Sequence, residues 1–417
     1  MLPIVFAAIF TAWLILFGAY WKPLLRLWRE PVLRAPVFII ESDDWGPGPA
    51  EHAQALTRLA SILCRFVDRR GRHPVTTLGL VLSAPDTGRT IGANFNQLHR
   101  LMLSDPRFRE VRRSIALGVE RGVFAPQLHG LEHYWPPALL AAARTDPAVK
   151  SWLSQKEIPA SEDLPPSLQS RWTDARTLPS QPIHSDLVRH AVAEEVSAFE
   201  AYLGRRPAVV VPPTFVWNET AEAAWAAAEV EVLVTPGRRN SGRDATGGLI
   251  SDGGPVLNCE RGVGGLTYLV RDVYFEPALG HSSAQALSAI ERKNDLGRPA
   301  LIETHRFNFV GNTAKTESSF RALESVLEAV LRRFPDTRFM SCEELARLLV
   351  GGSADIVERR LLRRYACWLA RTRTMPRFWK LALLTGVAIP LWLLTLVVPN
   401  RAATYSPENR KGSNTPA

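Results

Sequence analysis

Cysteine is scarce in this chain of 417 residues. The four cysteines, Cys64, Cys259, Cys342 and Cys367, lie far apart, and no two form a Cys-x-x-Cys pair. This spacing excludes a zinc-ribbon signature and gives no sign of a disulfide framework. We expect each cysteine to be a small apolar residue of the core.

Acidic residues are outnumbered, with 41 Asp and Glu against 50 Lys and Arg, which leaves a formal net charge of +9. A basic excess can indicate a nucleic-acid partner. Here, however, the basic residues crowd beside apolar segments, as in Arg359, Arg360, Arg363, Arg364, Arg371, Arg373, Arg377 and Lys380. This distribution favours anionic membrane lipids and argues against nucleic acid.

No basic residue precedes the first apolar run, 1–21, as a cleaved signal peptide would require. The run is long enough to cross a bilayer, and so is a second run at 381–398, which Gly386 and Pro390 interrupt. We therefore predict transmembrane helices at 1–21 and 381–398. The segments around them are a basic linker at 22–36, a soluble body at 37–350, a basic juxtamembrane segment at 351–380 and a polar tail at 399–417. Basic residues flank the body at both ends, so the positive-inside rule places it in the cytoplasm and both termini outside.

The body shows no internal repeat and alternates strand-like with helix-like patterns. The predicted strands are Val37–Ile40, Thr76–Leu82, Phe124–Gln127, Ala208–Val211, Val230–Val234, Leu266–Val270, Ala300–Glu303 and Arg338–Met340. Helical patterns cover Ala50–Asp68, Glu194–Leu203 and Ser318–Arg333, whereas 146–182 and 236–265 look irregular. This order predicts an α/β fold with a mostly parallel, buried sheet, open or closed into a barrel.

Chemistry-bearing residues follow three of these strands. Asp43 and Asp44 follow the first, and burying two neighbouring carboxylates is costly unless a cation compensates them. His129 and His133 follow another and are spaced to reach one metal ion from a helical turn or a convex loop. His305 follows a third. Alone, each has an ordinary explanation, such as a helix cap or a core histidine. Together they indicate an enzyme with a divalent metal, an open coordination position and a spare carboxylate as base.

These motifs resemble those of the polysaccharide deacetylase superfamily (NodB-homology, carbohydrate esterase 4-like), in a divergent bacterial branch. The similarity rests on Glu-Ser-Asp-Asp-Trp-Gly at 41–46, Pro-Gln-Leu-His-Gly-Leu-Glu-His at 126–133, a Pro-rich loop at 210–217 and Glu-Thr-His-Arg-Phe-Asn at 303–308. It spans about 37–349, nearly the whole body. The resemblance implies an irregular (β/α) barrel of the NodB type. The two apolar runs place the protein in the bacterial inner (cytoplasmic) membrane.

The resemblance also implies roles for individual residues. Asp43 would be the general base, and His305 would protonate the leaving amine. Asp44, His129 and His133 would hold one divalent metal ion, usually zinc in such families, with cobalt, nickel and iron as alternatives. Backbone N–H groups of Thr214 and Phe215 would help to stabilise the oxyanion. Weaker candidates for substrate or oxyanion contacts are Pro213, Trp217, Arg306 and Asn308.

Two features depart from the family pattern. Family members carry an arginine immediately before the paired prolines, where this chain has Val211. Arg306, next to His305, is the candidate to replace that cation. Separately, Arg271 and Asp272 follow a strand and are candidates to line the pocket. An Asp-x-x-Asp-Trp element that tunes the late histidine is also missing, and Glu276 or Glu303 could take its place.

The sequence thus predicts a membrane-anchored, metal-dependent hydrolase. It would remove an N- or O-acyl group, acetyl above all, from a carbohydrate or a lipid-linked glycan, with membrane lipids and no nucleic acid as partners. A glycoside hydrolase-like barrel, which would use paired carboxylates without metal, remains an alternative. A non-catalytic, membrane-tethered glycan-binding protein is a further one.

Overall fold

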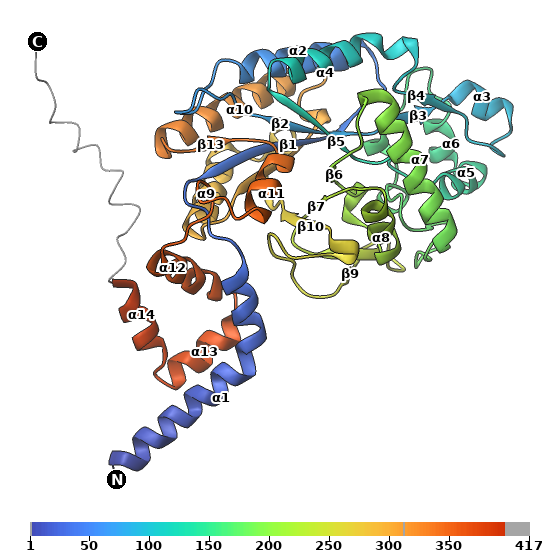
Figure 1. The fold of residues 1–417 in the computed structure, drawn as a ribbon. Coiled ribbons are helices and arrows are strands. Elements are labelled where there is room, and N and C mark those ends of the chain that lie inside the picture. Colours follow the sequence, from blue (N-terminus) through green and yellow to red (C-terminus); the bar gives the residue numbers. More distant parts are fainter. Residues whose placement is uncertain (1, 312, 397–417) are drawn as a thin grey trace, which may run out of the picture.

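The structure, a computed structural model, describes residues 2–311 and 313–396, so the predicted tail at 399–417 lies outside the described residues. A 9-stranded sheet forms the centre, in the order β10-β7-β6-β5-β2-β1-β12-β11, with β13 also paired to β1 (Figure 1). All of its ladders are parallel. The strands are β1 (Val37–Trp45), β2 (Thr76–Leu80), β5 (Phe124–Leu128), β6 (Val209–Val210), β7 (Val232–Thr235), β10 (Thr267–Val270), β11 (Val273–Tyr274), β12 (Ala300–His305) and β13 (Arg338–Phe339).

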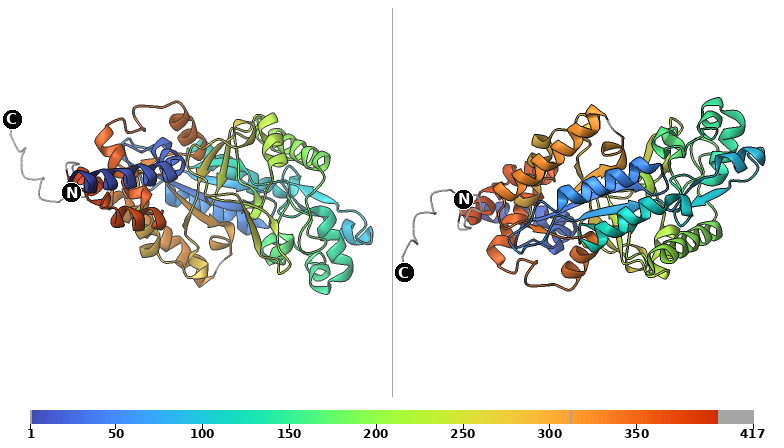
Figure 2. Two further views of the ribbon diagram at one scale, coloured as in Figure 1. Left: turned by 90° about the horizontal axis from the view of Figure 1, so that it is seen from below. Right: turned by 90° about the horizontal axis from the view of Figure 1, so that it is seen from above.

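Helices cover the outside of the sheet and two antiparallel hairpins lie beside it (Figure 2). The hairpins pair β3 (Ser83–Pro85) with β4 (Arg100–Met102), and β8 (Arg239–Arg243) with β9 (Leu249–Asp252). The helices of the body are α2 (Ala50–Leu63), α3 (Thr87–Gly92), α4 (Arg109–Glu120), α5 (Pro136–Thr145), α6 (Pro147–Trp152), α7 (Ser185–Leu203), α8 (Glu219–Ala227), α9 (Ser283–Asp295), α10 (Ala314–Arg333) and α11 (Cys342–Val350).

The two edge strands of the curved sheet are neighbours along the chain. Only Arg271 and Asp272 separate β10, which pairs with β7, from β11, which pairs with β12. The chain therefore closes the half-barrel at this point by changing partner from one edge of the sheet to the other. Arg271 lies at that break, and its N–H still donates to the carbonyl of Thr235 (2.8 Å).

Alternate residues of the strands pack on opposite faces, as the two-residue period of a strand requires. Val37 and Ile39 of β1 pack inside the half-barrel with Val209, Val232 and other aliphatic residues, and α11 covers its amino end. Phe38 and Ile40 face the surrounding helices. The interior is apolar at the amino ends of the strands, which leaves the carboxyl ends for polar groups.

All eight predicted strands are present in the one sheet, within a few residues of the predicted bounds, and the predicted parallel α/β class is confirmed. The region 146–182 holds α6 and short 3₁₀ turns. The region 236–265 holds the β8–β9 hairpin, which the glycine-rich sequence did not predict.

The ends of the chain differ from the prediction. The first helix, α1 (Leu2–Arg29), does not stop at residue 21 but continues through the predicted basic linker. It continues because Leu24 and Leu27 are buried, Leu24 against the C-terminal helices. These are α12 (Leu361–Thr372), α13 (Pro376–Leu384) and α14 (Ala388–Leu396).

The predicted second membrane helix at 381–398 is divided between α13 and α14, and its last two residues lie outside the described part. The division falls at Gly386, whose φ of +73° ends a right-handed helix. Among the described residues, α1 is the one helix long and apolar enough to cross a membrane. A second membrane-spanning helix is therefore not confirmed.

Candidate active site

The Asp pair lies at a bulge of β1. Neighbouring strand residues normally point to opposite faces of a sheet. The pairing of β1 with β2 shifts register between Ser42 and Trp45, and Asp44 has a φ of +68°, which is uncommon for a residue with a Cβ. Asp43 and Asp44 are both buried, and the bulge lets both serve one site. Backbone strain of this kind clusters at functional sites.

The two histidines of His-x-x-x-His come from the end of β5 and the bend that follows it, so the motif is a convex loop and not a helix. Their ring centroids are 5.1 Å apart. His129 Nδ1 donates to the carbonyl of Val211 (2.8 Å), which fixes the ring with Nε2 near Asp44. Nε2 is buried and has no hydrogen-bond partner.

Asp44, His129 and His133 form a cluster with the donor set of a divalent-metal site. One ligand atom from each lies within 4.8 Å of the others, and all three residues are buried. Asp44 Oδ1 is 3.3 Å from His129 Nε2 and 3.4 Å from His133 Nε2. Burial lowers the pKa of His133 to about 4, so this imidazole is neutral, as a ligand must be. The orphaned Asp44 Oδ1 and His129 Nε2 therefore fit a metal ion, whose identity the donors leave open.

Asp43, beside this cluster, is paired with Arg271. Arg271 Nη2 donates to Asp43 Oδ2 (2.6 Å), while Asp43 Oδ1 is buried without a partner. Burial raises the pKa of Asp43, but the Arg271 guanidinium, with His129 and His305, outweighs burial and holds the pKa below its ordinary value. Arg271, at the break between β10 and β11, thus supplies the cation that is missing at position 211.

The prediction that Arg306 supplies this cation is wrong. Its guanidinium instead binds Glu162 (2.6 Å), which lies in the 3₁₀ turn η2 (Ser161–Asp163). This ion pair ties the irregular region 146–182 to the residue next to His305, and Arg306 is buried beneath it. A contact between Arg306 and substrate is therefore not supported.

A polar layer crosses the half-barrel under Asp43. Besides Asp43, Arg271 contacts Glu41 (Nη1–Oε2, 3.1 Å) and Glu303 (Nε–Oε2, 3.4 Å). Gln127 donates to Glu41 (3.3 Å), and the Cys342 thiol donates to its other oxygen. Burial raises the pKa of Glu41 and of Glu303, although Arg271 opposes that effect. The layer fixes the position of the guanidinium that holds Asp43.

His305 faces the site from β12, in register with Asp43 of β1. Its Nδ1 contacts Glu276 Oε1 (2.6 Å), and its side chain is 25% exposed, more than any other site residue. Burial lowers the pKa of His305, but the hydrogen bond and charge of Glu276, together with the carboxylates of Asp44 and Asp43, outweigh burial and raise the pKa to about 10. Of the two candidates for the partner of this histidine, the structure selects Glu276.

The amide of Asn308 is fully buried, so the predicted contact with substrate is not supported. Its nitrogen donates to Glu276 Oε2 and its oxygen accepts from the N–H of Ala278 (3.0 Å). Asn308 thus positions the carboxylate that holds His305.

The Pro-rich loop lies at the end of β6. Thr214 and Phe215 have φ of +52° and +54°, a strained pair for non-glycine residues. The N–H of Phe215 donates to the carbonyl of Pro212 (3.0 Å), so it does not serve the predicted oxyanion role. The Phe215 ring instead lies 4.9 Å from the Arg271 guanidinium.

Two other members of this loop are buried. Trp217 is fully buried and donates from its indole to Glu222 (2.6 Å), and Pro213 is buried as well. A contact of Pro213 or Trp217 with substrate is therefore not supported. Thr214, which is partly exposed, stays a candidate contact.

Several supporting residues escaped the sequence analysis. Glu132, inside the His-x-x-x-His motif, accepts from the buried guanidinium of Arg171, and Arg171 also approaches Glu195 (3.3 Å). Glu195 in turn accepts from the N–H of Leu131 (3.2 Å). Gly79 of β2 leaves room for Asp43, because a Cβ there would overlap with Asp43 Oδ1. Of these residues, only Glu132 could have been noticed in the sequence, because it is a charged residue inside the His-x-x-x-His motif.

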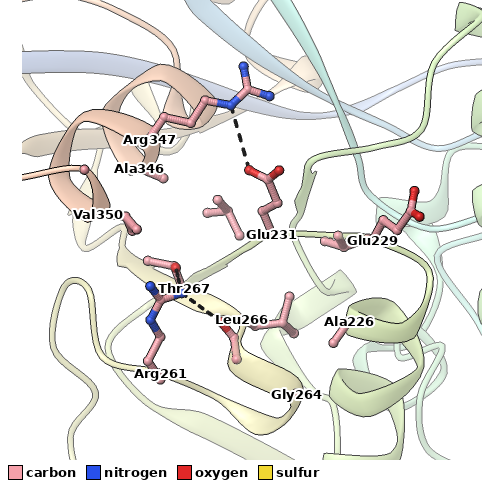
Figure 3. A pocket seen from close by; sticks show the side chains of 14 residues that line it. Ala226, Glu229, Glu231, Arg261, Gly264, Leu266, Thr267, Ala346, Arg347 and Val350 are labelled. Carbon is pink, nitrogen blue, oxygen red and sulfur yellow. Dashed lines mark hydrogen bonds and ion pairs between the residues drawn. The ribbon is translucent and has the colours of Figure 1, made fainter.

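A pocket of about 570 Å³ lies at the opposite, amino end of β7 and β10. Glu231 and Arg347 form an ion pair on one side of it (3.8 Å), and Arg261 lies on the other side (Figure 3). None of the predicted site residues lines this pocket. The chemistry-bearing residues are gathered at the carboxyl ends of the strands, as expected for a parallel α/β barrel.

The fold and site thus define a parallel α/β half-barrel with an Asp-His-His cluster, a second buried Asp and a late His at one end. No protein-family model matches the sequence. No curated protein matches it either. Solved structures that do match include a family 4 carbohydrate esterase from Streptomyces lividans in complex with acetate (11% identity, TM-score 0.35, 78% of this chain and 98% of that chain).

Two more matches are peptidoglycan deacetylase PdaC from Bacillus subtilis (12% identity, TM-score 0.36, 77% of this chain and 95% of that chain) and a family 4 acetyl xylan esterase from Clostridium thermocellum in complex with a cobalt ion (13%, 0.35, 77% and 94%). Two of these three proteins are named as family 4 esterases and one as a deacetylase. Because the TM-scores are below 0.5, we base the function on the geometry of the site.

Proposed function

We propose that this protein is a membrane-anchored, metal-dependent hydrolase that removes an N- or O-acyl group, acetyl above all, from a carbohydrate. The observation that carries the proposal is the convergence of Asp43, Asp44, His129, His133 and His305 from three strand ends at one point. Buried carboxylates and imidazoles with orphaned atoms are costly to maintain without a ligand.

Asp44, His129 and His133 would hold the metal ion. When bound, such an ion polarises the acyl oxygen and lowers the pKa of water at the site. A catalytic site of this kind needs three protein ligands and an open position, and this cluster offers three.

Asp43 and His305 would move the protons. Asp43, held ionised by Arg271, accepts a proton from the water whose oxygen attacks the acyl carbon. As the bond from that carbon to the sugar nitrogen or oxygen breaks, His305 gives a proton to the leaving amine or alcohol. The products are a carboxylic acid and a free amine or hydroxyl. Glu276 keeps His305 protonated for this step.

The anchor would be α1, which is long and apolar enough to span a bilayer. Leu16 and Leu24 of α1 pack against the C-terminal helices, and the indole of Trp368 donates to the carbonyl of Leu24 (2.9 Å). These contacts make α1 part of the folded protein, which supports a retained anchor over a cleaved signal sequence.

The first experiment is the metal content of the detergent-purified full chain. We expect about one divalent ion per chain, lost in Asp44→Ala and His129→Ala but kept in Asp43→Asn. Acetate release from acetylated glycans should be lost in all three variants. If the protein takes up no metal after reconstitution with zinc or cobalt, the metal-dependent mechanism is wrong. If it binds metal and Asp43→Asn has no effect with any acetylated glycan, the non-catalytic alternative holds.

A further inference from the structure

Each C-terminal helix contacts α1 at an identified residue, and these residues give its position along the axis of α1. The indole of Trp368 in α12 bonds to the carbonyl of Leu24. Phe378 of α13 packs against Tyr20, with ring centroids 5.5 Å apart. The turn after α13 is reached at Trp13, whose indole donates to the carbonyl of Thr385 (2.8 Å).

From that turn the chain runs back. Leu391 of α14 accepts a hydrogen bond from the hydroxyl of Tyr365 in α12 (2.9 Å), so α14 returns to the level of α12. Figure 1 shows the same path, with α13 running away from the body and α14 running back toward α12. The hairpin α13–α14 therefore begins and ends on the side of α1 that carries the body.

The depth of the hairpin matches half of a bilayer. Residues 13 to 24 of α1 rise about 16 Å at 1.5 Å per residue, whereas a hydrocarbon core is about 30 Å thick. Helices α13 and α14 have nine residues each, which is about 14 Å and too short to cross. Beyond Trp13, α1 continues to Leu2 for about another 16 Å.

The surface of the hairpin suits acyl chains. Its exposed large apolar side chains are Leu381, Leu383, Leu384, Ile389, Trp392 and Leu393, with Leu384 82% exposed. Near the start of the hairpin, Lys22, Arg373 and Arg377 are exposed to meet anionic headgroups. A backbone turn at membrane depth must be satisfied inside the protein, and the Trp13–Thr385 bond does this.

We propose that α13 and α14 form a re-entrant hairpin that is buried in the lipid leaflet next to the body and does not cross the bilayer. The C-terminus then lies on the same side of the membrane as the body, and the N-terminus lies on the other side. The proposal rests on the assignment of α1 as a membrane anchor and is independent of catalysis. It replaces the two-span topology that hydropathy and charge predicted.

Protease-site mapping of the full chain tests the topology. Cleavable tags are placed before Met1, after Ala417 and in the exposed turn at Gly253–Gly254, and sealed vesicles of both orientations are digested. We expect the C-terminal and Gly253 tags to be cut from one side and the N-terminal tag from the other. Cleavage of the C-terminal tag with the N-terminal one would overturn the hairpin. Cleavage of all three from one side would instead show that α1 does not span, which removes the basis of the proposal.

Spin labels on the full chain in liposomes test whether lipid surrounds the hairpin. Labels at L384C, I389C and L393C should be accessible to oxygen and shielded from a water-soluble nickel complex, with L384C the deepest. The matched control is L249C on the β8–β9 hairpin of the body, which is 49% exposed and should be accessible to nickel. Nickel accessibility at L384C, or a label immobilised by a second protein, would overturn the assignment to lipid.

Discussion

Arg271 and Asp43 are 228 positions apart in the chain, yet the guanidinium Nη2 of Arg271 lies 2.6 Å from Oδ2 of Asp43. The contact crosses the half-barrel from the break between β10 and β11 to the bulge of β1. One oxygen of the proposed base is thereby occupied and the other is left for the water.

The first prediction concerns this pair. We expect Arg271→Lys to lower kcat/KM by about 100-fold, because an ammonium cannot hold Asp43, Glu41 and Glu303 in one fork and the base is misplaced. With less help from the cation, the pKa of Asp43 rises and the acidic limb of the pH–rate profile moves to higher pH. The fold should also lose stability as the pH falls. A carboxyl group whose pKa is lowered in the folded state stabilises the fold fully only at pH values above its ordinary pKa, and it loses this effect as it becomes protonated.

Arg306→Ala is the matched control for Arg271→Lys. It removes the ion pair with Glu162 but no contact of Asp43, so the position of the acidic limb should stay as in the wild type. The assignment fails if Arg306→Ala moves that limb and Arg271→Lys does not.

The second prediction is a shift of the alkaline limb in Glu276→Gln. The Glu276 carboxylate helps Asp44 and Asp43 to raise the pKa of His305 to about 10, so removing the charge of Glu276 should lower that pKa. The alkaline limb of kcat/KM should therefore move to lower pH. Because the folded-state pKa lies above the ordinary 6.5, the pair stabilises the fold below pH 6.5 and loses that effect as the pH rises toward 10. Thermal melts across this range measure the loss, which Glu276→Gln should reduce, whereas Glu291→Gln, on the surface, should leave it unchanged.

The third prediction concerns Gly79. An added Cβ would overlap with Asp43 Oδ1, so Gly79→Ala should displace the carboxylate and lower kcat by about 10- to 100-fold. The metal content should not change, because the overlap involves no atom of Asp44, His129 or His133. Gly92→Ala is the control, since a Cβ at Gly92 meets nothing within 4 Å. Equal kcat for Gly79→Ala and the wild type would show that Asp43 is not held in this position.

The fourth prediction concerns stability and metal. A ligand at 100 times its dissociation constant stabilises the folded state by about 2.7 kcal/mol. Added zinc or cobalt should therefore raise the melting temperature of the wild type by several degrees, and a chelator should reverse the increase. The melting temperature of Asp44→Asn should not respond to metal. A response in this variant equal to that of the wild type would place the metal elsewhere.

The sequence predicted the elements whose signal is local. Apolar, β-branched runs identified all eight predicted strands, and the residues just after three of them identified Asp43, His129 and His305. It could not predict β11, because two residues are too short to show a period. Arg271 follows its strand as those residues do, but no local pattern reveals which carboxylate a guanidinium reaches across a barrel.

The C-terminal apolar run shows a second limit of prediction from the sequence. Hydropathy averages over a window and read 381–398 as one span, whereas a positive φ at Gly386 breaks the helix at a single residue. Burial of Asn308 and Trp217 likewise depends on tertiary packing, so their sequence positions suggested substrate contacts that the fold excludes.

The strand β1 connects α1, the proposed anchor, to the two carboxylates of the proposed site. It begins at Val37, eight positions after α1 ends at Arg29, and carries Asp43 and Asp44 at its far end. Six steps along a strand span about 20 Å. The length of this one strand thus separates the end of α1, the proposed anchor, from the two carboxylates of the proposed site.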